Sequence, residues 1–263
     1  MSTIERSMVR AINSGRCFAV VGAGPSCEIG LPPWRTLAES AIKQLKKDIH
    51  RTEIDQCDKL LSQSNYPAIF SVVAKTIGLD SLVKFVNKAL VTSHLNGQVY
   101  PFIARWPFSV YLTTNYDDYL NEFLTKESIP FITKHNSLSD FRLLRAESKG
   151  LIFKIHGDCS TKDDIVLTKE QYIEFQKADS RKYWREKIRS VLHMVNVVLI
   201  GYSASDPDFK DQLELAKEIA SPDHPIFMFA ADITLEDIRK YYLQYNIRII
   251  PYKNSDGTHR ELY

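Results

Sequence analysis

The sequence predicts an α/β fold, a Rossmann-like parallel sheet with helices on both faces and an inserted helical module. Short segments that are apolar throughout alternate with segments whose apolar residues recur at helical spacing. This alternation is typical of α/β architecture, and strands that are apolar throughout are typical of a parallel sheet covered on both faces. Four polar or glycine-containing turns follow such strands, and open α/β sheets bind their ligands at turns of this kind.

The expected elements begin with an amphipathic helix, because residues 1–15 are polar with apolar residues on one face. The apolar run 17–21 ends at a glycine and predicts the first buried strand. Each later strand is expected where a short apolar run returns between helical stretches. These strands are predicted at 110–113, 130–133, 151–155, 164–167, 197–200, 226–229 and 247–251.

Between the first two strands, residues 36–106 read mainly as helices. Apolar side chains recur there at three-to-four spacing, for example at Ile69 and Val73. This stretch is too long for a single crossover connection. We therefore expect one domain over residues 1–263 with a helical insertion at about 36–108.

The last residues, DGTHRELY, resemble the beginning of a helix. Thr258 is a plausible N-cap, and Glu261 and Leu262 would lie in the first turn. A helix that stops in its first turn indicates that the natural protein continues beyond Tyr263. The intact mass of the native gene product tests this expectation.

Composition and charge exclude several classes of protein. The net charge of +2 among 263 residues indicates neither a nucleic-acid-binding arm nor a membrane surface, so we expect no direct nucleic-acid binding. The polar start does not resemble a secretory signal, and no apolar run approaches the roughly 20 residues that span a bilayer. A cytoplasmic location is expected.

The four cysteines are Cys17, Cys27, Cys57 and Cys159, and no two of them form a CxxC pair. Structural zinc sites are built from closely spaced cysteine or histidine pairs, and a disulfide framework needs regularly placed cysteines. The sequence therefore predicts no zinc and no other metal.

The first glycine turn, Gly22-Ala23-Gly24, suits a phosphate-binding role. Glycines allow a tight turn and a close approach of backbone N–H groups to phosphate, ahead of a helix N-terminus. The dehydrogenase fingerprint GxGxxG requires a third glycine, and Cys27 occupies that position. The turn therefore indicates a dinucleotide site of another type, although a turn that merely joins strand to helix remains an alternative.

Asn115 and His156 each follow a predicted core strand, and Asp117 follows Asn115 closely. Taken singly, such an asparagine is more often a turn former and such a histidine a structural residue. Parallel strands deliver both side chains to one sheet edge, next to the glycine turn. A histidine that accepts a proton and an asparagine that holds a ribose hydroxyl or a water suit cleavage of the ribose–nicotinamide bond. Asp117 would stabilise the developing positive charge, hold the nicotinamide amide, or simply begin a helix.

Five segments resemble motifs of the sirtuin superfamily and occur in the same order. They are GAGPS at 22–26, GLPPWR at 30–35, TNYD at 114–117, HG at 156–157 and GYS at 201–203. The corresponding sirtuin motifs are GAG-x-S, GIPDFR, TQNID, the catalytic HG and the GTS turn at the adenosine ribose. Pro33 stands where GIPDFR has an aspartate, and the two cysteine pairs of the deacylase zinc module have no counterpart.

The segment GYSASDPDF, with Asp206 and Phe209, is more similar to bacterial sirtuin-like defence domains than to deacylase sirtuins. The resemblance implies a zinc-free enzyme that hydrolyses NAD in abortive infection against phage, with Asn115 and His156 as the catalytic pair. The implied NAD-binding residues are Gly22, Ala23, Gly24, Ser26, Trp34, Arg35, Thr114, Asp117, Gly201, Ser203 and Asp206. It also implies a homo-oligomer, or a sensor domain or partner subunit that recognises phage or nucleic acid.

Two alternative functions remain open at this point. A protein-lysine deacylase would use the same NAD site but would require an acyl-lysine groove, and the missing zinc ligands argue against it. A non-catalytic nucleotide-sensing module would need neither Asn115 nor His156. The activating signal, and whether the product is linear or cyclic ADP-ribose, do not follow from these motifs.

Overall fold

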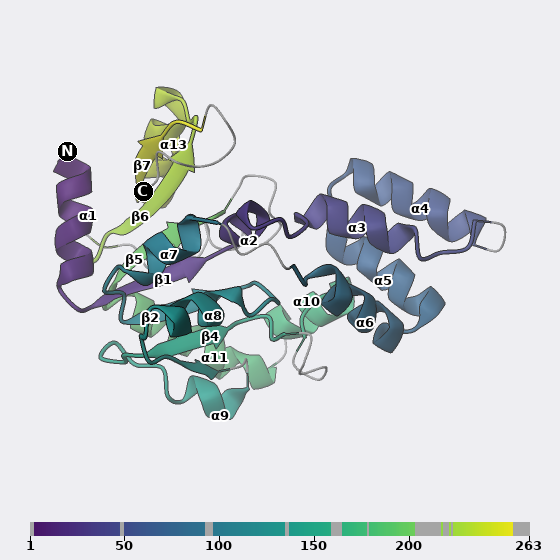
Figure 1. The fold of residues 1–263 in the computed structure, drawn as a ribbon, viewed down its shortest axis with the longest axis horizontal. Coiled ribbons are helices and arrows are strands. Elements are labelled where there is room, and N and C mark those ends of the chain that lie inside the picture. The colour runs from purple at the N-terminus through teal and green to yellow at the C-terminus, as the bar shows by residue number, and fades with distance from the viewer. Residues whose placement is uncertain are drawn as a thin grey trace.

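The computed structural model describes residues 3–47, 50–92, 97–134, 137–158, 165–177, 179–202, 217, 221 and 223–254. Its centre is a seven-stranded sheet in the order β3-β4-β2-β1-β5-β6-β7, in which every neighbouring pair is parallel (Figure 1). The strands are β1 (Cys17–Val21), β2 (Val110–Thr113), β3 (Ile132–Lys134), β4 (Leu151–Lys154), β5 (Asn196–Ile200), β6 (Ile226–Ala231) and β7 (Ile247–Tyr252). The predicted α/β class with a parallel, Rossmann-like sheet is confirmed.

Helices cover both faces of the sheet, because successive side chains of a strand point to opposite faces. Phe18 and Leu112 belong to one core with α10 (Lys169–Lys177) and α11 (Asp179–Leu192), and α13 (Leu235–Tyr245) packs against it. Ala19 and Tyr111 belong to the opposite core with α1 (Thr3–Asn13), α7 (Val99–Ala104) and α8 (Tyr119–Lys126). The short helices α2 (Gly24–Glu28) and α9 (Leu138–Phe141) complete the described helices of this part.

Four helices pack on one another around a third core. They are α3 (Trp34–Ile42), α4 (Arg51–Ser62), α5 (Tyr66–Ile77) and α6 (Leu79–Ala89). In Figure 1 this cluster lies beside the end of the sheet at which β1 leads into α2. Tyr116, which follows β2, is buried in the same core. The cluster therefore adjoins the carboxyl edge of the sheet, where the four motif turns lie.

A proline, an asparagine and a glycine fix the boundaries of α5. Pro67 occupies its first turn, where a missing N–H costs nothing, and the Asn65 side chain accepts a hydrogen bond from the Ala68 N–H. Gly78 separates α5 from α6 with a φ of 87°, a conformation that favours glycine. Pro67 and Gly78 thus mark where the helices of this stretch begin and end.

The prediction of a strand at 164–167 is wrong for the residues of this run that the structure describes. Asp164 lies outside the described residues, and Ile165, Val166 and Leu167 are buried without forming a strand. Their backbone is hydrogen-bonded to turns instead of a neighbouring strand. The Val166 N–H donates to the His156 carbonyl, and the Val166 carbonyl accepts from the Tyr116 hydroxyl. The run is apolar because it fills the space between the sheet and the helical cluster.

Within the ranges that the structure describes, no helix is long and apolar enough to cross a membrane. The predicted helical start of a further C-terminal element, at Thr258, Glu261 and Leu262, lies outside those ranges.

Candidate active site at the carboxyl edge of the sheet

The four motif turns are contiguous because their strands are neighbours. The glycine turn follows β1, the asparagine turn β2, the histidine turn β4 and the Gly201 turn β5, and these strands lie in the order β4-β2-β1-β5. Their last residues are in register, since Thr113 pairs with both Val21 and Lys154. The strands therefore end at one level, and their turns form a single polar edge.

The first and last of these turns approach each other closely and are joined by a backbone hydrogen bond. The Gly24 N–H donates to the Gly201 carbonyl over 2.9 Å, so this N–H is already engaged. A Cβ added at Gly24 would lie 2.6 Å from the Gly201 Cα, and one added at Gly201 would lie 2.3 Å from the Pro25 Cδ. Gly201 also has a φ of 75°. Glycine is required here for close packing of the two turns.

The Asn115 side chain is oriented by the glycine turn. Its Nδ2 donates to the Gly22 carbonyl over 2.9 Å and to the Ser26 Oγ over 3.2 Å. Because a carbonyl only accepts, the nitrogen of the amide must face Gly22. Within the described part of the chain, no donor contacts the Asn115 Oδ1, which leaves this oxygen as the acceptor for a ligand.

Ser26 connects Asn115 to Asp117. Its hydroxyl donates to the Asp117 Oδ2 over 2.8 Å and lies 2.7 Å from the Tyr100 hydroxyl. The Tyr119 N–H donates to the other carboxylate oxygen, Oδ1, over 3.2 Å. Asp117 is thus held on both oxygens, at the beginning of α8.

A small pocket of about 40 Å³ opens beside Asn115. It gathers residues of three motifs, namely Ala23, Ser26, Leu31, Pro32, Trp34, Thr114, Asn115, Tyr116 and Asp117, together with Cys27, Leu37 and Leu90. A second pocket of about 270 Å³ shares Leu90, Tyr116 and Asp117 with it. The two adjoining spaces are where a ligand could reach the Asn115 amide.

His156 lies on the neighbouring turn, two residues beyond the end of β4, as Asn115 lies two beyond the end of β2. Its side chain is 5% exposed and packs edge-on against Tyr172 and Phe175, at ring distances of 5.1 and 5.6 Å. Its Nδ1 lies 3.4 Å from the Tyr172 hydroxyl, a long hydrogen bond. His156 is not among the described residues that line the pocket beside Asn115.

The other residues that the motifs single out have three different outcomes. Trp34 packs against Tyr116 at 5.9 Å between ring centroids and faces the pocket. Arg35 instead pairs with Glu39 over 3.0 Å on the exposed side of α3, with its side chain 57% exposed. Ser203, Asp206 and Phe209 lie outside the described residues.

Lys154, which is not among the predicted site residues, ties the asparagine turn to the histidine turn. Its side chain is only 2% exposed, and its Nζ donates to the carbonyls of Tyr116 and Asp117 over 3.1 and 2.8 Å. The same ammonium lies 3.5 Å from Asp158 and 3.6 Å from Asp118. A lysine inside the apolar strand LIFKI, directly before the histidine turn, was the available signal.

Tyr100 was also missed. It is completely buried and reaches Ser26 from α7, 74 positions away in the sequence. No local pattern distinguishes it from the apolar residues around it, so only the fold reveals this contact.

The described residues contain no group of three or more histidine, cysteine or acidic side chains that could hold a metal ion. Cys17 and Cys57 are buried free thiols. Cys159 lies outside the described residues, and the absence of zinc stays a prediction.

Burial raises the pKa of the Asp117 carboxyl above its ordinary value of 3.8, and the Ser26 hydrogen bond and the Lys154 charge only partly oppose this. Between the ordinary and the raised pKa, the folded state binds more protons than the unfolded state. The free energy of unfolding therefore falls as the pH rises through that window. Asp117→Asn keeps an acceptor for Ser26 and removes this titration.

We expect Asp117→Asn to gain stability relative to the wild type as the pH rises above 3.8. Urea unfolding of both proteins at several pH values measures the difference. A difference that does not change with pH would show that burial does not govern this carboxyl.

Comparison with known proteins agrees with the motifs. Residues 109–250, more than half of the chain, match the model of the SIR2-like domain family. The chain is 27% identical over 205 residues to the NAD(+) hydrolase ThsA of Cytobacillus dafuensis, covering 78% of this chain and 39% of that protein. It is 23% identical over 192 residues to the NAD(+) hydrolase ThsA of Bacillus cereus, covering 71% and 37%.

A protein of the same name from Acinetobacter baumannii is 25% identical over 165 residues, covering 63% of this chain and 32% of that protein. The chain thus spans less than two fifths of the length of these curated relatives. Of the five sirtuin-like segments, those at 114–117, 156–157 and 201–203 lie inside the matched region, which extends from β2 into β7. The chain belongs to the SIR2-like family.

Proposed function

We propose that this chain is an NAD⁺ glycohydrolase, which cleaves the bond between ribose and nicotinamide to give nicotinamide and ADP-ribose. The observation that carries the proposal is the fixed Asn115 amide, whose Oδ1 is left as an acceptor beside a pocket lined by the glycine turn and Asp117. The three similar proteins named NAD(+) hydrolase ThsA support the same reaction.

The reaction needs no general acid to protonate the leaving group, because nicotinamide leaves as a neutral molecule. As the C–N bond breaks, the ribose acquires oxocarbenium character, and a water oxygen then bonds to the same carbon. The protein must orient the ribose, protect the cationic centre and position the water. Asn115 Oδ1 accepts a hydrogen bond from a ribose hydroxyl or from the water, and Asp117 supplies negative charge or holds the nicotinamide amide.

In this proposal His156 takes the proton of the attacking water or orients that water. It follows β4, the strand next to β2, and lies two residues beyond the end of β4, as Asn115 lies two residues beyond the end of β2. Gly22, Ala23, Gly24, Ser26, Trp34 and Thr114 surround the nicotinamide half and the diphosphate. Gly201, Ser203 and Asp206 contact the adenosine half, and Arg35 would have to leave Glu39 to take part.

Substituting His156→Ala is expected to lower the rate of nicotinamide release by about 100-fold, the usual contribution of a positioned general base. Nicotinamide is quantified by chromatography after incubation of the purified protein with NAD at high protein concentration. His193→Ala, at an exposed histidine that follows α11, is the matched control and should keep the wild-type rate. A rate for His156→Ala within threefold of this control would remove His156 from the mechanism.

The biological setting is also a proposal. The family resemblance favours a cytoplasmic effector of abortive infection against phage, active as a homo-oligomer or together with a sensor domain or partner subunit. An NAD hydrolase without restraint would kill its own host, so an activating signal is expected. Cell survival and NAD content after phage infection, with wild type and Asn115→Ala compared, test this setting.

A further inference from the structure

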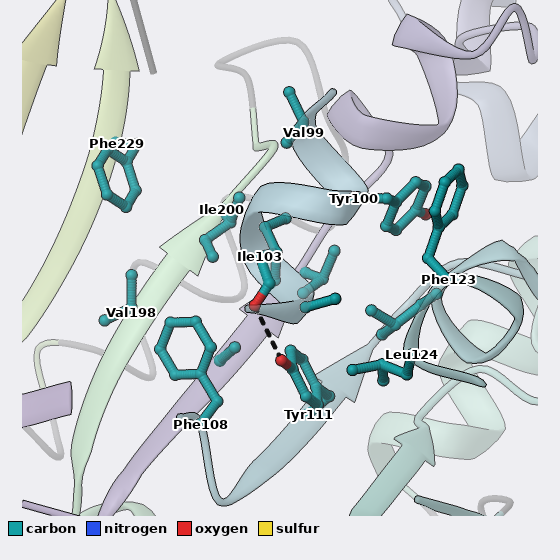
Figure 2. Close-up of a cluster of buried hydrophobic side chains, with 14 of the residues drawn as sticks. Val99, Tyr100, Ile103, Phe108, Tyr111, Phe123, Leu124, Val198, Ile200 and Phe229 are labelled. Carbon is teal, nitrogen blue, oxygen red and sulfur yellow. Dashed lines mark hydrogen bonds between the residues drawn. The ribbon is translucent and has the colours of Figure 1, made fainter. Parts of the chain in front are cut away.

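Tyr100 has a fixed ring, and its hydroxyl joins the hydrogen bonds that link Asn115, Ser26 and Asp117, here called the Asn115 network. The ring is fully buried and stacks on Phe123 at 5.3 Å between centroids, as Figure 2 shows. The hydroxyl lies 2.7 Å from the Ser26 Oγ and 3.5 Å from the Asn115 Nδ2. Only the contact with Ser26 is a short hydrogen bond.

The direction of these hydrogen bonds follows from proton counting. The single hydroxyl proton of Ser26 is donated to the Asp117 Oδ2. The Ser26 oxygen can therefore only accept from its other neighbours, so the Tyr100 hydroxyl is the donor. Burial, and then the charge of Asp117, raise the pKa of Tyr100 well above 10.0, which keeps this proton in place.

The Ser26 oxygen accepts from two donors, Tyr100 and the Asn115 amide. We propose that Tyr100 is a positioning residue for Asn115: its hydroxyl holds the Ser26 oxygen where the Asn115 nitrogen donates to it, so that Oδ1 faces the pocket. The role of Tyr100 in catalysis rests on the proposed function. Its role in orienting the Asn115 side chain does not depend on that function.

Tyr111 provides a matched control. It is likewise completely buried, in β2, and its hydroxyl donates to the backbone carbonyl of Ile103 over 3.1 Å, the dashed bond in Figure 2. Both Tyr100→Phe and Tyr111→Phe remove one buried hydroxyl and one hydrogen bond from the same core. Only the first removes a contact of the Asn115 network.

The first test compares steady-state NAD cleavage by the wild type and both variants. Tyr100→Phe should lower kcat by about 10- to 100-fold with KM within about threefold, because the amide is misplaced and not absent. Tyr111→Phe should keep kcat within about twofold, with a loss of thermal stability similar to that of Tyr100→Phe. Ser26→Ala combined with Tyr100→Phe should be no slower than the slower single variant, since both act on one contact.

Equal kcat values for the two phenylalanine variants, in an active wild type, would overturn the role of Tyr100 and leave the proposed function intact. A wild type that stays inactive in every oligomeric state tested, also with candidate partner subunits added, would instead contradict the proposed function. A second measurement then decides on Tyr100. Hydrogen exchange of the Asn115 side-chain amide is followed by NMR, with its signals assigned by comparison with Asn115→Ala. We expect about tenfold faster exchange in Tyr100→Phe and no change in Tyr111→Phe, because only the first variant loosens the amide. Identical exchange in both variants would overturn the proposal.

Discussion

Asn115→Ala is expected to reduce the rate of NAD cleavage by about 1,000-fold, because it removes the acceptor that positions the ribose or the water. The fold should survive, although loss of the bonds to Gly22 and Ser26 costs about 1–3 kcal/mol of unfolding free energy. Nicotinamide release and thermal unfolding, measured on the same sample, separate the two effects.

Asn115→Asp tests the orientation of the side chain. Aspartate has nearly the same shape, but it places an oxygen against the Gly22 carbonyl, where the amide nitrogen now donates. We expect Asn115→Asp to be less stable than Asn115→Ala, even though it removes fewer atoms, because a buried charge without a donor is costly. If Asn115→Asp were the more stable of the two and also active, the assigned orientation would be wrong.

Lys154→Met is expected to lower the unfolding free energy by about 3–5 kcal/mol, the cost of breaking a buried ion pair by removing one partner. The ammonium is the donor for the Tyr116 and Asp117 carbonyls and pairs with Asp158, and the lysine side chain is 2% exposed. Urea unfolding measures the loss.

Lys75→Met is the matched control for Lys154→Met. Lys75 makes a shorter ion pair, 2.8 Å to Glu170, but its side chain is 72% exposed. Exposed pairs contribute about 0–1 kcal/mol, so the control should be nearly neutral despite the better distance. A loss for Lys154→Met no larger than that for Lys75→Met would show that Lys154 does not tie the two turns together.

The sheet could be predicted from the sequence because its strands are short apolar runs bounded by turns. β2, predicted at 110–113, has these bounds in the structure. The edge strand β3, predicted at 130–133, begins two residues later and ends one residue later. Ile132 is 61% exposed, and among the described strands β3 has only β4 as a neighbour to fix its position. The run at 165–167 was taken for a strand because burial between two cores has the same apolar signature as burial within a sheet.

The candidate site was partly predictable for a similar reason. Motif turns after β1, β2, β4 and β5 come together because those strands are neighbours, and parallel strands present the same end. Tyr100 was not predictable, since its contact with Ser26 depends on how α7 packs on the sheet. The engaged Gly24 N–H was not predictable either, because it requires the close approach of the Gly201 turn.

The measurement that tests the central claim most directly is the product analysis of NAD incubated with the purified protein, without any acylated peptide. Chromatography should show nicotinamide and ADP-ribose released in equal amounts, and neither product with Asn115→Ala. Cleavage that requires an acyl-lysine peptide and yields O-acyl-ADP-ribose would identify a deacylase and contradict the account. NAD that binds but stays intact in every oligomeric state tested, also with candidate partner subunits added, would contradict it as well and favour a nucleotide-sensing module.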